Sequence, residues 1–177
     1  MSEGAVLELP ATVHQELRRH LLRKPGGNEE AAFVFANHRA ADNRFGYLEW
    51  FPVPPDGFVV QLPYHFELTD ETRARTIKRA HDLGCSVIEF HSHTGPWPAQ
   101  FSPSDWAGFE EIVPHIWWRL KGRPYAAAVV TKDGFDAFAW VVDPNTPARL
   151  AGISVGDQLL EPTRLSPLER DGYDWKI

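Results

Sequence analysis

A helix pattern followed directly by a strand pattern, near the middle of the chain, limits the possible folds most. Residues 70–83, "DETRARTIKRAHDL", carry acidic side chains in the first turn and follow Thr69, a residue typical of helix N-caps. Gly84 is placed to end this helix in the left-handed conformation. Residues 85–93, "CSVIEFHSH", then form a strand pattern with apolar residues on both faces. Such a strand needs cover on both sides, so a sheet with helices packed against it is expected.

Repeating apolar positions predict the elements that come before this pair. Leucine or valine recurs every fourth residue from residue 9, so a helix is expected over Leu9–Lys24, ended by the Pro-Gly-Gly that follows. The apolar run Ala31–Asn37 predicts a buried strand, with Arg44–Val53 as its partner across a short polar link. A third strand is expected over Gly57–Leu62, at an edge or an end because Pro63 follows it.

The second half of the chain adds one more helix and a hairpin. The helix is expected to begin near Pro103, and the strands Tyr125–Val130 and Phe135–Val142 are expected to pair around Asp133-Gly134. The order of elements predicts an α/β (α+β) protein with a single mixed β-sheet flanked by helices, in one domain over residues 1–142. Residues 143–177, rich in Pro and Gly, are expected to be a C-terminal extension that packs on this domain or binds a partner.

Composition excludes several classes of protein. With 43% hydrophobic and 12% aromatic residues the chain is expected to fold, and its 177 residues suit one core. Cys85 is the single cysteine, which rules out a disulfide framework within one chain and a Cys-rich zinc site, and favours a reducing cytoplasm. The net charge of −6 argues against nucleic acid as a partner. We expect no membrane association, because no apolar run has a membrane-spanning length and the N-terminus lacks the pattern of a secretory signal.

Two histidines and an aspartate are candidate metal ligands. Side chains alternate along a strand, so His91 and His93 point to the same face, about 7 Å apart along the chain. Asp105 lies one turn into the next helix, close enough to reach the end of the strand. A capping box explains Ser102 and Asp105 without any chemistry, and an H-x-H pair alone is a weak signal. The strand, the H-x-H pair, the short loop and the S-x-x-D helix start are less expected together by chance than either motif alone. This joint pattern predicts a divalent metal with one coordination position left for water.

The stretch "HSHTGPWPAQFSPSD" (residues 91–105) resembles the signature of the JAMM/MPN (JAB domain) metalloproteases, which consists of an upstream Glu, H-x-H, a loop and S-x-x-D. The chain departs from it at Thr94, where the family usually has Pro, and the loop is one residue longer than usual. The resemblance implies a JAB/MPN fold, whose layers are similar to those of zinc nucleotide deaminases. It also implies one Zn²⁺ held by His91, His93 and Asp105, with the Ser102 hydroxyl donating to the developing oxyanion. A deaminase itself needs a P-C-x-x-C pair, which a single cysteine excludes.

The upstream glutamate of the signature has more than one candidate. In "NEEAAFVFA", Glu29 places Ala32 at the small position that the family pattern wants, whereas Glu30 would place Phe33 there. Glu29 is therefore the expected general base, with Glu30 as the alternative. Glu89 shares the strand face of the histidines and is a third candidate, although its place deeper in the strand suits a partner that orients a histidine ring.

The resemblance also implies a substrate. It predicts peptide or isopeptide cleavage after the C-terminal glycine of a ubiquitin-like protein, in precursor processing and in deconjugation. The short chain resembles bacterial members of the family, which act beside activating and conjugating enzymes in ubiquitin-like conjugation or antiviral defence systems. A groove for the extended substrate tail is expected at residues 58–68 and at Trp97. The alternatives are a catalytically silent MPN-type scaffold, and a peptidase that acts on a sulfur-carrier protein or a short peptide.

Overall fold

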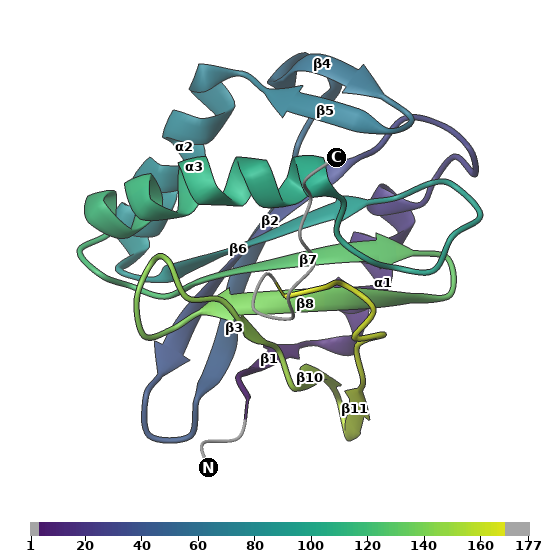
Figure 1. Ribbon diagram of the computed structural model, residues 1–177. Coiled ribbons are helices and arrows are strands. Elements are labelled where there is room, and N and C mark those ends of the chain that lie inside the picture. The colour runs from purple at the N-terminus through teal and green to yellow at the C-terminus, as the bar shows by residue number, and fades with distance from the viewer. Residues whose placement is uncertain (1–3, 169–177) are drawn as a thin grey trace.

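A computed structural model of the chain describes residues 4–168, and it shows a mixed α/β fold (Figure 1). Within these residues a nine-stranded mixed sheet is flanked by three α-helices, and a small two-stranded sheet lies beside them. The predicted fold class, a mixed sheet with helices packed against it, is confirmed. The prediction of a single sheet is wrong, because two strands near the middle of the chain pair only with each other.

The centre of the large sheet consists of strands that the sequence predicted. β6 (Ser86–Ser92) pairs antiparallel with β2 (Ala31–Arg39) and parallel with β7 (Tyr125–Thr131). β3 (Arg44–Pro52) continues the sheet beyond β2, and β8 (Gly134–Trp140) continues it beyond β7, both as antiparallel hairpin partners. β6 therefore lies inside the sheet, and its side chains contribute to the hydrophobic clusters on both faces, as its apolar character on both faces predicts.

The N-terminal segment begins with a strand that the sequence analysis missed. β1 (Val6–Leu9) lies parallel to β3, and α1 (Ala11–Leu21) starts only after Pro10. The predicted helix start at Leu9 is therefore wrong. Leu7 and Leu9 are both buried two residues apart, which is the period of a strand and not of a helix.

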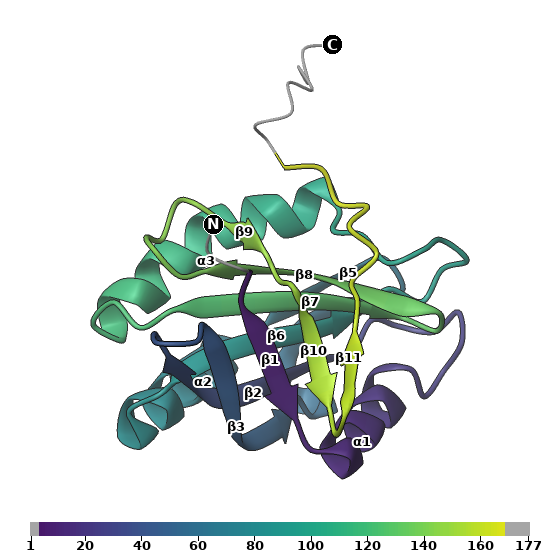
Figure 2. The same ribbon diagram turned by 90° about the horizontal axis from the view of Figure 1, so that it is seen from below.

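Part of the segment after residue 142 also joins the sheet. β9 (Ala148–Arg149) pairs with β8, and β10 (Gly152–Val155) pairs with β1 on one side and with β11 (Gln158–Leu160) on the other. Figure 2 shows β1, β10 and β11 side by side. The sheet thus brings residues from the two ends of the described chain together.

The small sheet is formed by β4 (Phe58–Leu62) and β5 (His65–Leu68), with a one-turn 3₁₀ helix, η1 (Pro55–Gly57), before it. It does not extend the edge of the large sheet, where a third strand was predicted. The carbonyl of Leu62 instead accepts a hydrogen bond from the N–H of Glu29, with N and O 2.9 Å apart. The hairpin is thereby fastened over the start of β2.

Helices cover both faces of the large sheet. α2 (Asp70–Leu83) is capped by Thr69 and ends at Gly84, whose φ of +67° is left-handed, as predicted. It packs with α3 (Pro103–Arg119) on the same face, and α1 packs on the opposite face. The side chains of β2 alternate accordingly between the two hydrophobic clusters. Among residues 4–168, no helix has the length and apolar character needed to cross a membrane.

Candidate metal centre

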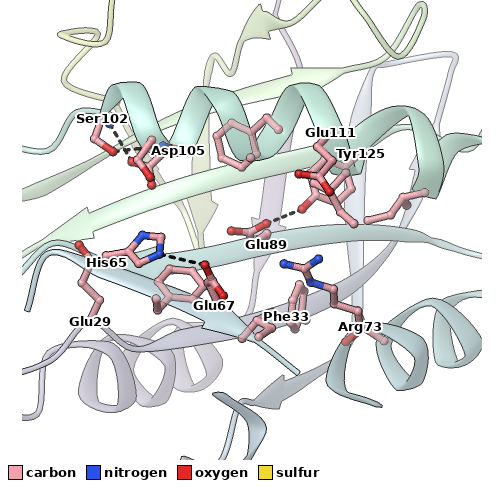
Figure 3. Close-up of a pocket in the computed structure, with 18 of the residues that line it drawn as sticks. Glu29, Phe33, His65, Glu67, Arg73, Glu89, Ser102, Asp105, Glu111 and Tyr125 are labelled. Carbon is pink, nitrogen blue, oxygen red and sulfur yellow. Dashed lines mark hydrogen bonds and ion pairs between the residues drawn. The ribbon is translucent and has the colours of Figure 1, made fainter. Parts of the chain in front are cut away.

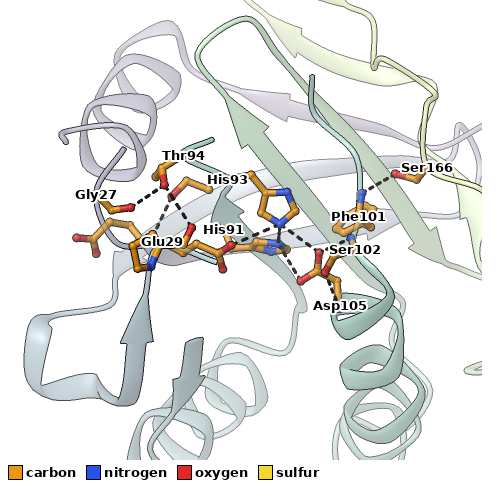
Figure 4. Close-up of polar contacts among 12 residues, drawn as sticks. Gly27, Glu29, His91, His93, Thr94, Phe101, Ser102, Asp105 and Ser166 are labelled. Atoms are coloured by element: carbon orange, nitrogen blue, oxygen red, sulfur yellow. Dashed lines mark hydrogen bonds and ion pairs between the residues drawn. The ribbon is translucent and has the colours of Figure 1, made fainter. Parts of the chain in front are cut away.

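The side chains of His91 and His93, at the end of β6, converge with that of Asp105, in the first turn of α3 (Figure 4). The Nε2 atoms of His91 and His93 lie 3.3 Å apart. Oδ1 of Asp105 lies 3.3 Å from Nε2 of His91, and Oδ2 lies 3.2 Å from Nε2 of His93. One potential donor atom from each side chain lies within 4.8 Å of the other two.

These separations fit a metal ion. Tetrahedral zinc holds nitrogen and oxygen donors at about 2.0–2.1 Å, which places two such donors about 3.3 Å from one another. Two imidazole nitrogens and one carboxylate oxygen also suit a borderline divalent cation. The group can bind a metal ion, and with three protein ligands a tetrahedral ion would keep one position open.

The strand places the two histidines in different surroundings. His91 lies on the face of β6 that α2 and α3 cover, with its side chain 1% exposed, and its ring is flanked by Phe66 and Phe101 at centroid distances of 5.5 and 5.8 Å. His93 follows the last residue of β6, where its N–H still donates to the carbonyl of Val130 (3.0 Å). Its side chain is 22% exposed. The centre is therefore buried on one side and accessible on the other.

The start of α3 fixes Asp105, the third candidate ligand, through a capping box, which is the structural explanation that the sequence also offers for these residues. The N–H of Asp105 donates to Oγ of Ser102 (3.1 Å), and the N–H of Ser102 donates to Oδ2 of Asp105 (2.7 Å). One carboxylate thus caps the helix and faces both histidines. Asp105 can therefore cap the helix and be a candidate metal ligand at the same time.

Charge at the centre favours a cation. Burial acts to raise the pKa of Asp105, but His91, His93 and the Ser102 N–H hold that pKa far below its ordinary range. Burial alone would lower the pKa of His91, yet Asp105 and Glu89 outweigh burial and raise the pKa to about 10. The three side chains therefore attract positive charge to their common point, whether it is carried by a proton or by a metal ion.

The three candidate glutamates have different positions. Oε1 of Glu29 lies 3.7 Å from Nε2 of His93, and burial raises the pKa of Glu29 to about 7 against the opposing effect of the two histidines. Glu30 instead pairs with Arg23, whose Nη2 donates to Oε1 at 2.7 Å. Of Glu29 and Glu30, only Glu29 faces the three candidate ligands. The raised pKa leaves this carboxyl able both to take and to give a proton near neutral pH.

Glu89 lies behind His91, away from the open side of the centre. Its Oε1 is 3.7 Å from Nδ1 of His91, and its Oε2 accepts a hydrogen bond from the Tyr125 hydroxyl at 2.7 Å. The 3.7 Å separation is longer than a hydrogen bond, and Nδ1 of His91 has no hydrogen-bond partner among the described residues. Glu89 therefore acts on the ring through its charge, from the position in which a carboxylate can orient a ligating histidine. Tyr125 was predicted only as part of a strand, although a tyrosine that precedes a run of alanines and valines is a visible departure from that run.

A cavity of about 430 Å³ begins beside the centre and extends between β5, α2 and α3 (Figure 3). Glu29, Ser102 and Asp105 line the end that meets the centre, and Tyr125, Glu111 and Arg73 line the other end, with Glu89 between them. Apolar side chains, among them Phe33, Phe66 and Phe109, form part of the wall. Residues 64–68 of the segment that the sequence analysis assigned to a groove line this cavity.

The loop between the two halves of the motif is held near the centre. The Thr94 hydroxyl donates to the carbonyl of Gly27 (2.6 Å), which joins the loop to the segment just before Glu29 (Figure 4). Thr94, the residue that departs from the family pattern, thus has a structural role of its own. Trp97 is 76% exposed and does not line this cavity, so its place in the wall of a groove stays a prediction.

Comparisons with known proteins do not assign the chain to a family. No protein-family model matches the chain, and no curated protein matches it. Among solved structures, the chain is similar to a protein from Salinibacter ruber (strain DSM 13855) known from a solution structure. The two are 18% identical over 91% of this chain and 94% of the other, with a TM-score of 0.45. A likeness of this size supports no statement about function.

Proposed function

We propose that the chain is a zinc-dependent peptidase of the JAMM/MPN type, with a JAB/MPN fold. The observation that carries this proposal is the joint geometry of the three candidate ligands and a buried carboxyl beside them. Oε1 of Glu29 lies 3.7 Å from Nε2 of His93, which in turn lies 3.2 Å from Oδ2 of Asp105. A structural zinc site would have a fourth protein ligand in place of an acid–base group.

The residues around the ligands have roles that follow from their chemistry. When bound, zinc supplies a Lewis acid that lowers the pKa of water and polarises a carbonyl group. Glu29 takes a proton from the water that attacks the scissile carbonyl carbon and gives it to the departing amine. Burial, which raises the pKa of this carboxyl to about 7 in the metal-free protein, favours such a role. Oγ of Ser102 accepts from the N–H of Asp105, so its own hydrogen is free to donate to the developing oxyanion.

The substrate proposed is the C-terminal glycine tail of a ubiquitin-like protein, in its precursor or attached to a target. An extended, narrow tail suits a cavity that runs alongside β5, whose other edge pairs with β4. The ubiquitin-like protein would then be the main partner, with its activating and conjugating enzymes in the same cytoplasmic conjugation or defence system. The acidic net charge of −6 also favours proteins over nucleic acids as partners.

The test is cleavage of a ubiquitin-like protein fused through its terminal glycine to a reporter. The zinc-loaded wild-type protein should release the reporter, whereas Glu29→Gln and Asp105→Asn should not. Glu29→Gln should still bind zinc, which separates loss of the general base from loss of the metal. Zinc binding without cleavage of any fusion would favour the scaffold, and cleavage of a short peptide or a sulfur-carrier fusion alone would favour the other peptidase.

A further inference from the structure

The segment Thr163–Ser166, close to the end of the described chain, lies against the loop that leads into α3. We call these four residues the C-terminal strap. The N–H of Thr163 donates to the carbonyl of Phe135 at 2.8 Å, which ties the start of the strap to β8. Ser166, at its other end, is 0% exposed. The strap is therefore fixed to the large sheet and not merely laid over it.

A buried carboxylate in β8 holds the strap. Asp136 is 0% exposed, and its Oδ2 accepts from the N–H of Ser166 at 2.9 Å. Its Oδ1 accepts from the N–H of Arg164 at 3.3 Å and from the N–H of Ala137 at 3.0 Å. Nη1 of Arg149 lies 3.9 Å from Oδ2 and supplies the opposite charge. A buried carboxylate requires such donors, so Asp136 and the strap depend on each other.

The backbone of the strap is bent to make these contacts. Arg164 has φ of +59°, a left-handed conformation that is unfavourable for a residue with a Cβ atom. The bend lets the N–H groups of Arg164 and Ser166 both reach Asp136. Strain of this kind persists only where surrounding contacts determine the conformation.

Two hydroxyl groups of the strap hold the loop before α3. The Thr163 hydroxyl donates to the carbonyl of Ala99 at 2.6 Å, and Oγ of Ser166 accepts from the N–H of Phe101 at 2.8 Å (Figure 4). Ala99 and Phe101 are 0% and 2% exposed. Residues 93–102 contain no helix or strand, so these two bonds supply order that the loop lacks by itself.

The fixed end of the loop leads directly to the candidate ligands. Phe101 packs its ring against that of His91, and the next residue, Ser102, forms the capping box with Asp105. We propose that the C-terminal strap is a positioning element of the metal centre, which keeps Asp105 in register with the two histidines. This inference rests on the proposed metal site, and it gives a role to part of the segment after residue 142.

Removal of one hydroxyl tests the proposal with little change of shape. In Thr163→Val the bond to Ala99 is lost, together with a longer one (3.5 Å) from the N–H of Leu165 within the strap. Exchange of the Ser102 and Asp105 amide hydrogens should become roughly fivefold faster, which is the effect of the one bond that reaches the loop. Zinc affinity, measured by competition with a chelator, should fall roughly tenfold, as on loss of other residues that orient ligands. The ligand-field spectrum of the cobalt(II)-loaded protein should change as well. Ser166→Ala should behave in the same way.

Two control variants separate positioning from general loss of stability. Thr163→Ser keeps the hydroxyl and should restore both amide exchange and zinc affinity. Thr131→Val makes the same substitution at a buried hydroxyl that has no hydrogen-bond partner among the described residues, and it should leave the loop unchanged.

Each other outcome has a defined meaning. Unchanged exchange at Ser102 and Asp105 in both Thr163→Val and Ser166→Ala overturns the proposal, and so does faster exchange spread equally over β2 and α2. Faster loop exchange with unaltered zinc affinity also overturns it, because the strap would then order the loop without placing the ligand. If the wild-type protein binds no zinc, the proposed function fails. Amide exchange of Asp105 in Thr163→Val and Ser166→Ala then shows by itself whether the strap holds this residue.

Discussion

Asp105 and Ser102 share one capping box but have different parts in the proposed centre, and this difference gives a sharp prediction. Asn at position 105 keeps a side-chain oxygen for the Ser102 N–H, yet it loses the negative charge that lies 3.2–3.3 Å from both histidine Nε2 atoms. Ala at position 102 removes the hydroxyl that caps Asp105 but keeps the carboxylate. The two variants should therefore separate metal binding from helix capping.

The magnitudes follow from linkage and from capping energies. Zinc at a free concentration 100 times its Kd stabilises the folded state by about 2.7 kcal/mol. For a chain of this size that corresponds to a rise in Tm of roughly 5 to 11 °C. Ser102→Ala should lower Tm of the metal-free protein by roughly 2 to 4 °C, from a cap worth about 1 kcal/mol, and leave most of the zinc-induced rise. Asp105→Asn should abolish the zinc-induced rise.

The assay is thermal unfolding followed by circular dichroism, with and without buffered zinc, for the wild type and both variants. The zinc-induced change is compared within each variant, so differences in metal-free stability cancel. An equal rise in Tm for Asp105→Asn and the wild type would refute Asp105 as a ligand. Loss of the rise in Ser102→Ala, with the carboxylate intact, would show that the capping hydroxyl is itself a ligand or holds Asp105 entirely.

Three further predictions concern single groups. Glu29→Gln should keep the zinc-induced rise in Tm but lower kcat by roughly 10²- to 10⁴-fold in the fusion assay, since it removes only the proton transfer; a variant with full activity would exclude Glu29 as the base. Tyr125→Phe removes the donor to Glu89, so zinc affinity in a chelator competition should fall roughly tenfold, whereas unchanged affinity would leave Glu89 without an orienting role. Burial raises the pKa of the Cys85 thiol from 9.0 to about 11, so a thiol reagent at pH 8 should modify the folded protein far more slowly than the unfolded one, and equal rates would contradict this burial. Because the folded-state pKa is the higher one, this thiol stabilises the fold fully below pH 9, and that contribution disappears as the pH rises toward 11.

Local patterns were sufficient to predict the elements that carry the candidate ligands. The predicted helix Asp70–Leu83 and the strand that follows it both form, because cap, period and stop signal agree there. β1 was missed because four residues before a proline give little periodicity, and α1 follows at once. β10 was missed for another reason: it pairs with β1, about 146 residues away, and nothing local in a stretch rich in Pro and Gly indicates that partner.

The same contrast applies to the candidate site. The H-x-H spacing and the S-x-x-D helix start predicted that His91, His93 and Asp105 would meet, because strand alternation and the first helical turn fix those directions. The strap was beyond such reasoning. Its hydroxyls reach Ala99 and Phe101 across 64 and 65 residues of sequence, and only the assembled sheet brings these positions together.

The capping box has a consequence for metal binding beyond the start of α3. A free aspartate side chain loses rotamer freedom when it becomes a ligand, and that entropy loss weakens binding. In this chain the Ser102 N–H already holds Oδ2 of Asp105, and the packing of Phe101 against His91 restricts the neighbouring ring. The Asp105 side chain thus loses its rotamer entropy already on folding, through contacts that do not involve a metal. Capping a helix and binding a metal therefore support each other at Asp105. The capping box explains the S-P-S-D sequence as the start of a helix, and it also holds the carboxylate in place for coordination.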